Sequence, residues 1–539
     1  MKTEKLKQNV KGYVHQFEDG GLRLLRKGQK GVIHAIFSRF GLVLILLLLQ
    51  VGLLFSIFRW FGNLWPHYFG GSVVVTSAMV IYLLNSKMDN SAKITWMVVV
   101  AIAPVVGIPM FFYVKSNFGH NILRKRLLEL EDQLRGWLPQ SQKAVEQLKA
   151  LEPGAASLAK YLYGRGGGFP VYQNTAMTYF PGGEAKFEEL LRQLERAEEY
   201  IFVEYFIIDE GLMWGKILEV LARKALQGVD VRVMYDGTCE FSTLPRNYPR
   251  LLEKLNIQCK VFSPVQPFVS THYNYRDHRK ILVIDGRVGF TGGVNLADEY
   301  INHIQKHGRW KDAAVMLKGE AVRSLTAQFL QMWGILKEPE YEQFLTRPIP
   351  VPENAKGVAA PYGDCPLDGE RVGEMVYIDL LNRARDYIHI MTPYLILDGE
   401  LETALKFAAE RGVDVHLILP GKPDKQFPYA LAKSHYSALL DSGVKISEWT
   451  PGFTHAKLVV MDGVEAVVGT INLDYRSLYH HFENAVWMRR VGSIRDMETD
   501  FQDTLARCRT VEATLQSVWQ GKKLLRLMGL LLKVIAPLM

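Results

Sequence analysis

The stretch RDHRKILVIDGRVGFTGGVN, residues 276–295, decides the fold because its pattern returns later in the chain. Residues 454–472 read THAKLVVMDGVEAVVGTIN, with histidine, lysine, aspartate and Gly-x-x-Asn at the same offsets. A single His-x-Lys pair carries little information in a chain with 14 histidines and 64 lysines and arginines. Two complete copies of the longer pattern do not arise by chance, so the sequence predicts an internal duplication.

Strand-like and helix-like runs recur in the same order around both copies. The apolar run 200–208 is typical of a buried strand, a helical pattern follows it and stops at Gly228, and another strand comes next. The same order starts again at Tyr387, and the corresponding helical pattern stops at Gly412. An α/β unit of about 180 residues therefore appears twice. Alternating strands and helices predict sheets layered with helices, an α/β/α architecture, in each half.

The chain has 539 residues, too many for one ordinary core, and 48% of them are hydrophobic. The apolar excess lies near the start, whereas a proline-rich, charged stretch separates the two α/β units. The predicted segments are a basic cytoplasmic lead (1–36), a membrane region (37–114, with segments at about 40–58, 66–86 and 94–114), a helical stalk (115–160), a first α/β domain (161–340), a linker (341–356), a second α/β domain (357–519) and an amphipathic C-terminal helix (520–539).

The three apolar segments each approach the length of about 20 residues that a helix needs to cross a bilayer. The long basic lead and the absence of a small-residue cleavage motif argue against a cleaved signal peptide. Lysines and arginines place the lead and the loop 87–93 in the cytoplasm, but those at 115–126 indicate the same side. Three complete crossings cannot satisfy both, so the number and orientation of crossings stay open.

Charge and cysteine content restrict the function classes. The four cysteines are scattered and form no C-x-x-C pair, which excludes a disulfide framework or a cysteine zinc site. The net charge of +8 is partly beside the apolar segments, where it suits anionic lipid headgroups. Nucleic acid is the other polyanion to consider. No basic and aromatic stripe for a nucleic-acid strand is found elsewhere in the sequence.

The repeated motif has a chemical interpretation. Residues two apart in a strand face the same side, so His278 and Lys280 are expected to project together, as are His455 and Lys457. If the two halves pack face to face, both pairs converge on one pocket with partners suited to a phosphate. One histidine can attack phosphorus while the other serves as acid and then as base. The sequence thus predicts phosphodiester transfer in a two-sided site.

The remaining motif residues are assigned supporting roles. Asp285 and Asp462 are expected to fix the histidine tautomers or to orient the lysines. Asn295 and Asn472, together with the lysines, are expected to hold the charge that builds on the phosphoryl oxygens. No metal site is predicted, because lysine repels cations and no carboxylate cluster accompanies the histidines in the sequence.

Several blocks of the sequence resemble one known family. It is similar to the phospholipase D superfamily, with its paired HxKxxxxD motifs, and within it to the bacterial cardiolipin synthases. This resemblance implies two phospholipase D-like α/β/α domains related by a pseudo-twofold, preceded by N-terminal transmembrane helices. The blocks that carry it are YRDHRKILVIDG, GRWKDAAV, TPYL, FTHAKLVVMDG, GTINLDYRS and the membrane segment ITWMVVVAIAPVVGIPMFFYV.

The resemblance also implies an activity. A phosphatidyl group from one phosphatidylglycerol is held on His278, and a second phosphatidylglycerol attacks it with His455 as general acid and base. Cardiolipin and glycerol are the products, with no cofactor, and the expected location is the cell membrane, multi-pass, with cytoplasmic catalytic domains. A lipid hydrolase uses the same residues and stays an alternative, as do a membrane-tethered nuclease and a non-enzymatic scaffold.

The chain departs from the family pattern in several places. Gly293 and Thr470 stand where a serine is common, and His480 and His481 lie where an asparagine usually precedes the glutamate. Near the end, Lys522, Arg526 and Lys533 fall on one face of a leucine-rich helix. That pattern suits a helix in the headgroup layer, or an ordinary helix packed on the second domain.

Overall fold

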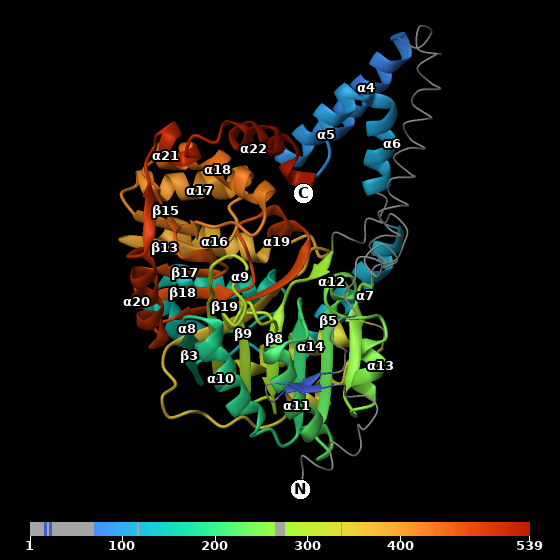
Figure 1. Cartoon of the computed structure of the whole chain (residues 1–539), viewed down its shortest axis with the longest axis vertical. Helices are drawn as coiled ribbons and strands as arrows, with labels where there is room; N and C mark the ends of the chain where they lie inside the picture. Colours follow the sequence, from blue (N-terminus) through green and yellow to red (C-terminus); the bar gives the residue numbers. More distant parts are fainter. Residues whose placement is uncertain are drawn as a thin grey trace.

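The computed structural model describes residues 16–18, 21–23, 69–115, 118–264, 275–335 and 337–538. The predicted membrane segment 40–58 and most of the basic lead lie outside the described residues. Figure 1 shows two sheets, one above the other, with helices on their outer faces. A pair of short strands, β1 (Gln16–Glu18) and β2 (Gly21–Arg23), lies against α11 of the lower half.

The first sheet has seven strands and mixed direction. β4, β5 and β6 run parallel, and the other neighbours pair antiparallel. Each residue of β4 is buried because the sheet is covered on both faces. In spatial order the strands are β3 (Thr175–Phe180), β11 (Ala314–Gly319), β9 (Val288–Gly292), β8 (Lys280–Ile284), β4 (Tyr200–Tyr205), β5 (Asp230–Asp236) and β6 (Gln258–Phe262).

The second sheet repeats this order and these directions, so the predicted duplication is confirmed at the level of topology. It adds an antiparallel edge strand, β20. In spatial order its strands are β12 (Val358–Asp364), β19 (His481–Arg489), β18 (Glu465–Gly469), β17 (Leu458–Met461), β13 (Tyr387–Met391), β14 (Asp414–Pro420), β15 (Lys445–Trp449) and β20 (Cys508–Val511).

The helices cover these sheets with apolar faces of helical period. In α11, Trp214, Ile217, Leu218 and Leu221 stand at positions i, i+3, i+4 and i+7 and are fully buried. The helices of the first half are α10 (Gly183–Leu194), α11 (Leu212–Ala225), α12 (Cys239–Ser242), α13 (Tyr248–Glu253) and α14 (Val322–Trp333), and those of the second are α16 (Val372–Arg383), α17 (Gly399–Glu410), α18 (Gln426–Leu440), α19 (Tyr475–Tyr479), α20 (Ser493–Leu505), α21 (Leu515–Trp519), α22 (Lys523–Ile535) and the short η3 (Ala536–Leu538).

The halves are joined by two short parallel strand pairs. β10 (Arg309–Lys311) of the first half pairs with β16 (Gly452–Thr454) of the second. β7 (Arg276–Asp277), just before the first motif, pairs with the start of β19. One hydrophobic core extends across both sheets through this seam. The two halves therefore form one packed unit rather than two independently mobile domains.

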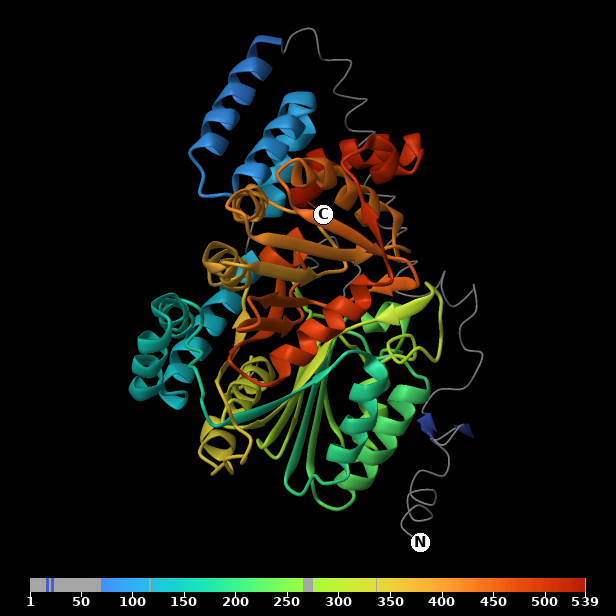
Figure 2. The ribbon, with the colours of Figure 1, turned by 90° about the vertical axis from the view of Figure 1, so that its left-hand side faces the viewer.

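The N-terminal helices differ from the predicted membrane segments. Segment 94–114 is not one helix: α5 (Asn90–Ile102) and α6 (Pro104–Lys115) are separated at Ala103, where a proline begins the second helix. α4 (Phe69–Leu84) covers most of the segment 66–86. Within the described parts of the chain, no helix combines the length and apolarity needed to cross a membrane. In both ribbon views, α4, α5 and α6 project beyond the sheets, near α22 (Figures 1 and 2).

The predicted stalk and linker are both packed against the domains. The stalk is helical as expected, in α7 (Phe118–Trp137), α8 (Gln142–Leu151) and α9 (Pro153–Gly164). Arg124 of α7 donates to the backbone oxygen of Leu367 in the second half, at 2.8 Å. The linker contains α15 (Tyr341–Leu345), whose apolar side chains are buried against α14. Its proline and charge content indicated a loop, but three aromatic and leucine side chains at helical spacing fold it into the core.

Candidate active site

The motif aspartates form tight turns. Asp285 and Gly286 join β8 to β9 with φ values of +52° and +64°, and Asp462 and Gly463 join β17 to β18 with the same values. Each turn is closed by a backbone hydrogen bond of 3.0 Å. Positive φ at both central positions is the two-residue hairpin geometry for which Asp-Gly is favoured. This local constraint accounts for the Asp-Gly pair in both copies.

The expectation that Asp285 and Asp462 orient the histidines or lysines is wrong in this structure. The Asp285 carboxylate accepts hydrogen bonds from the backbone N–H groups of Glu198, Glu199 and Tyr200, at 2.8–2.9 Å. Asp462 accepts three such bonds from residues 385–387, at 2.9–3.0 Å. Both carboxylates therefore hold the start of the neighbouring strand, because the turn directs them away from the imidazoles.

His278 is held by the other half of the molecule. Its backbone N–H donates to Phe482 at 2.9 Å, and its Nδ1 lies 2.9 Å from the Glu483 carboxylate. The histidine is only 6% exposed and Glu483 is fully buried. The hydroxyl of Thr470 donates to Glu483 as well. A buried carboxylate with these partners fixes the position and tautomer of the imidazole.

His455 makes the matching contacts in the opposite direction. Its backbone N–H donates to Lys311 at 2.6 Å, and its Nδ1 lies 2.8 Å from Oδ2 of Asp312, in the first half. The other oxygen of Asp312 accepts from the N–H of Ala313 at 2.8 Å. Each half thus supplies one motif histidine and the carboxylate that orients the other histidine.

The electrostatics keep both imidazoles neutral in the empty site. Burial, together with nearby Lys280, lowers the pKa of His278 well below its usual value, and Glu483 offsets this only partly. Burial and Lys457 lower the pKa of His455 to about 4. Burial alone would raise the pKa of Glu483, but His278 outweighs it and holds that pKa below its usual range. A neutral imidazole facing an ionised carboxylate carries its proton on Nδ1 and leaves Nε2 with a free lone pair.

The motif lysines lie beside their histidines, as the i, i+2 spacing predicts. Nζ of Lys280 donates to the backbone oxygen of His278, and Nζ of Lys457 to that of His455, each at 2.6 Å. Nζ of Lys457 also lies 2.9 Å from Nε2 of His455. Burial lowers the pKa of Lys280 to about 8 and that of Lys457 to about 7. These ammonium groups are poorly hydrated and have N–H donors left over, which favours binding of an anion.

The two motifs lie in one electrostatic environment. The charge of Lys280, in the first half, contributes to the lowered pKa values of His455 and Lys457, in the second. Gly293 is also part of this meeting point, because a Cβ there would lie 2.0 Å from Asp312 and 3.0 Å from the backbone oxygen of His455. The glycine that replaces the common serine thus makes room for the Asp312 carboxylate.

The two asparagines differ from each other. The Asn295 amide is already used: its oxygen accepts from Ile207 N–H at 3.1 Å and its nitrogen donates to Tyr300 at 2.7 Å. It positions its own loop, and the structure gives no support to its predicted phosphate contact. The Asn472 oxygen is buried and accepts no hydrogen bond from the described residues. Asn472 therefore has free hydrogen-bonding capacity at the site.

Sequence reasoning missed Asp312 and Glu483, the carboxylates that orient the histidines. Asp312 stands in GRWKDAAV, a block that carries the family resemblance, whereas Glu483 stands in YHHFEN, where the chain departs from the family pattern, and neither lies inside the repeated motif. The prediction that no carboxylate cluster accompanies the histidines is therefore wrong, because the fold brings one carboxylate to each of them. Spacing in the sequence does not reveal these contacts, because His455 and Asp312 are 143 positions apart and His278 and Glu483 are 205 positions apart.

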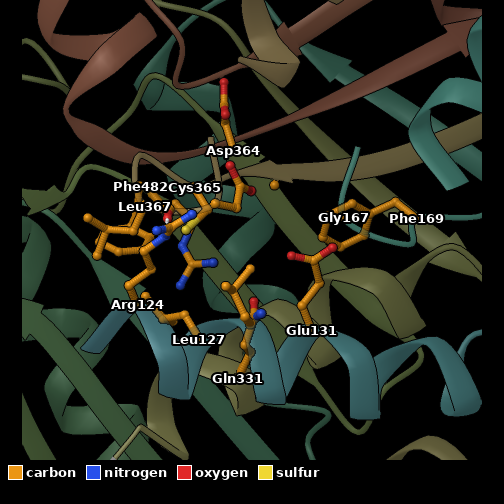
Figure 3. Close-up of a pocket in the computed structure, with 14 residues that line it drawn as sticks. Arg124, Leu127, Glu131, Gly167, Phe169, Gln331, Asp364, Cys365, Leu367 and Phe482 are labelled. Atoms are coloured by element: carbon orange, nitrogen blue, oxygen red, sulfur yellow. Dashed lines mark hydrogen bonds between the residues drawn. The ribbon is translucent and has the colours of Figure 1, made fainter. Parts of the chain in front are cut away.

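A pocket lies behind the strand that carries the first motif. In Figure 3, Arg124 and Glu131 rise from α7 toward Asp364 and Phe482. Arg279, between the two motif residues His278 and Lys280, lines this pocket. Arg279 pairs with the buried carboxylate of Glu204 at 2.6 Å, so Glu204 is a structural partner of the motif strand. Neither motif histidine lines this pocket.

Comparison with known proteins gives the family. A family model described as "Cardiolipin synthase, PLD-like domain" matches residues 190–333 and 377–505, which include both motifs. The chain belongs to this family of phospholipase D-like enzymes. A cardiolipin synthase from Geobacillus kaustophilus is 35% identical over 79% of this chain and 85% of its own length. Cardiolipin synthase 2 from Bacillus anthracis is 34% identical over 79% of this chain and 82% of its own.

Two further matches are a relative of higher identity and a solved structure with the same fold. An uncharacterized protein from Streptococcus mutans is 54% identical, over 85% of this chain and 99% of its own length. The crystal structure of a phosphatidylserine synthase from Haemophilus influenzae Rd KW20 matches with a TM-score of 0.53 and 14% identity. That match covers 67% of this chain and 93% of the other, and it shows that the two share a fold. This member of the cardiolipin synthase family therefore has two phospholipase D-like domains and is an enzyme.

Replacing Asp285 with alanine is expected to destabilise the protein by about 3 kcal/mol, because three backbone N–H groups, that of Tyr200 buried, lose a charged acceptor. Thermal unfolding of the detergent-solubilised protein measures this loss. Asp285→Asn keeps one acceptor oxygen and is expected to lose less. The folded fraction of either variant keeps kcat within a few-fold of wild type. A large fall in kcat without loss of stability would contradict the structural role.

Proposed function

We propose that this enzyme transfers a phosphatidyl group between two phosphatidylglycerol molecules and releases cardiolipin and glycerol. The observation that carries the proposal is the exchange of carboxylates across the seam, because it holds Nδ1 of both motif imidazoles and assigns the chemistry to their Nε2 atoms, with Nζ of Lys457 2.9 Å from Nε2 of His455. Support also comes from the family model and from the curated relatives named cardiolipin synthase. Neutral imidazoles backed by carboxylates are suitable as nucleophile and as general base.

In the first step, Nε2 of His278 attacks the phosphorus of a phosphatidylglycerol. The new bond joins nitrogen to phosphorus, and the bond between phosphorus and the glycerol headgroup oxygen breaks. As the anionic phosphodiester binds, it raises the pKa of His455 above its value of about 4, and Nε2 of this imidazole takes up a proton from solvent. The departing glycerol then takes that proton from Nε2 of His455.

In the second step, the terminal hydroxyl of another phosphatidylglycerol attacks the same phosphorus. His455, now neutral, takes the proton of that hydroxyl, the bond to His278 breaks, and cardiolipin leaves. Lys280, Lys457 and Asn472 hold the non-bridging oxygens in both steps and stabilise their charge. No cofactor enters this scheme. Choosing a lipid hydroxyl over water depends on positioning the acceptor and limiting bulk water.

We further propose that an anionic membrane is the partner of the projecting helices and of α22, and that the enzyme is a multi-pass protein of the cell membrane with cytoplasmic catalytic domains. α22 packs Gly529 against the backbone of Ala430 in α18, which agrees with the alternative of a helix packed on the second domain. The helix also exposes an apolar stripe beside a basic edge. The stripe comprises Leu524, Leu527, Leu530, Leu531 and Val534, and the edge comprises Lys522, Arg526 and Lys533.

Given phosphatidylglycerol alone, the purified enzyme is expected to form cardiolipin and release glycerol in equal amounts, without added metal or nucleotide. His278→Ala removes the nucleophile and is expected to abolish both products. His389→Ala is the matched control, because His389 is also buried, with Nδ1 2.9 Å from a glutamate, but lies outside the motifs. Mass spectrometry of the lipids and an enzymatic glycerol assay measure the outcome. Phosphatidic acid as the main product would favour the hydrolase.

The pH dependence follows from the buried lysines. Burial lowers the pKa of Lys457 to about 7 and that of Lys280 to about 8, and only their protonated forms bind the phosphate as cations. The value of kcat/KM is therefore expected to fall about tenfold or more from pH 7 to 9, as these ammonium groups lose their protons. Saturating substrate moves the decline to higher pH, because bound phosphate stabilises the ammonium. A profile of kcat/KM that stays flat to pH 10 would exclude this role.

A peptide of residues 520–538 is expected to bind vesicles that contain anionic lipid and to become helical on them. Replacing Lys522 and Arg526 with glutamine should weaken this binding by about 2 kcal/mol, or roughly 30-fold, since each basic residue near an anionic surface contributes about 1 kcal/mol. Replacing Leu527 and Leu531 with serine should weaken binding to neutral and anionic vesicles alike. Circular dichroism measures the helix content, and sedimentation of the vesicles measures the fraction of peptide bound. Equal binding of all three peptides would exclude this surface as the membrane-binding site.

A further inference from the structure

A third histidine lies beside the proposed nucleophile. The ring of His481, at the start of β19, is 5.3 Å from the ring of His278, centroid to centroid. Its Nδ1 lies 3.5 Å from Oε1 of Glu483, the carboxylate that also contacts Nδ1 of His278 at 2.9 Å. One ligand atom from each of these three side chains lies within 4.8 Å of the other two. The cluster is buried and combines two imidazoles with one carboxylate.

His481 lies against Glu483 and beside the rings of His278 and Phe206. Its Nδ1 is enclosed and makes no hydrogen bond within the described part of the chain. The neighbouring His480 differs, since its ring contacts Tyr275 on the far side, at 6.3 Å between centroids. Phe206 covers the imidazoles of both His278 and His481, with ring centroids 4.8 and 6.5 Å away. The shared carboxylate brings ring nitrogens of two imidazoles together, and this is an arrangement that a divalent cation can bind.

We propose that His278, His481 and Glu483 bind one Zn²⁺ ion, which inhibits the enzyme. Zinc takes imidazole nitrogen and carboxylate oxygen at about 2.0–2.2 Å, so ligand atoms around a tetrahedral ion lie about 3.4 Å apart. The two known separations in the cluster, 2.9 and 3.5 Å, bracket that distance. Three protein ligands leave one position for water, and small rotations of the rings complete the site.

The charges around the cluster allow a cation. Glu483 is ionised and held in place by Thr470, and the carboxylate of Asp474 is near enough to act on His481. Lys280 and Lys457 are the opposing charges, and both act on Glu483. Nζ of Lys280 is directed to the backbone oxygen of His278 and lies over the ring of Phe206, and Nζ of Lys457 is directed to the backbone oxygen of His455. Two imidazole nitrogens and a carboxylate oxygen are donors that zinc takes in proteins.

Binding at Nδ1 explains the inhibition. A neutral imidazole has one ring proton, and a metal on Nδ1 moves that proton to Nε2. Nε2 of His278 then has an N–H instead of a lone pair and cannot form a bond to phosphorus. No proton is lost or gained by the ring. This consequence rests on the proposed role of His278 as nucleophile, whereas the binding of zinc does not.

The direct test measures Zn²⁺ binding to the full-length protein in detergent, after chelator treatment, by competition with a chromophoric chelator. The wild type is expected to bind one ion per chain. His481→Asn should weaken binding at least about tenfold, since it removes one of three ligands. His481→Cys keeps a zinc ligand and should retain binding. His480→Asn, the same change one residue earlier, should bind zinc as the wild type does.

Equal zinc affinity in the wild type and His481→Asn would overturn the site, and thermal unfolding shows whether each variant is folded. Activity assays with added Zn²⁺ address the second part: the wild type should be inhibited and restored by EDTA, and His481→Asn should resist the same concentration. Binding at His481 that leaves wild-type activity unchanged would overturn the nucleophilic role of His278 while leaving the metal site in place. The two failures are thus distinguishable.

Discussion

Every other feature of the site depends on the carboxylates that cross the seam. Nδ1 of His278 is held by Glu483 and Nδ1 of His455 by Asp312, so neither half contains a complete site. The backbone bonds of the two histidines use the residue just before each carboxylate, Phe482 and Lys311. A shift of one half against the other would break four such contacts together, and the tautomers of both imidazoles would no longer be fixed. The continuous hydrophobic core keeps this geometry rigid.

The duplicated fold carries a site that is not symmetric. Arg279 follows the first motif histidine and is buried against Glu204, whereas Ala456 takes its place in the second motif. Thr470 contacts a carboxylate, whereas its counterpart is a glycine. His278 also has His481 beside it, and His455 has no third imidazole among its described ring contacts. Two equivalent histidines can therefore serve unequal roles, as the proposed transfer requires.

The sequence predicts much of this fold because its strongest signals are local. Continuous apolar runs and helical patterns identified β4, α11 and β13, and the repeat identified the duplication. Asp285 was misread for a physical reason: spacing placed it near the histidine along the chain, but a turn with positive φ directs its carboxylate to the next strand. Asp312 and Glu483 could not be found by spacing, since only the packing of the two halves brings them to the imidazoles. The apolar segment 94–114 has the composition of one helix, and Pro104 divides it.

The transfer reaction places a further demand on this architecture. In the proposed mechanism the phosphohistidine can be attacked by water as well as by a lipid, so the outcome depends on which hydroxyl arrives next. The lysines and histidines are buried, and limited access of water would favour a lipid acceptor that brings its own hydroxyl. Burial also lowers the pKa values of Lys280 and Lys457, so the same burial affects phosphate binding and the access of water. A substitution that opens the seam would therefore let water attack in place of the lipid hydroxyl and increase hydrolysis. Its effect on substrate binding would be smaller, because hydration of the lysines would restore their charge.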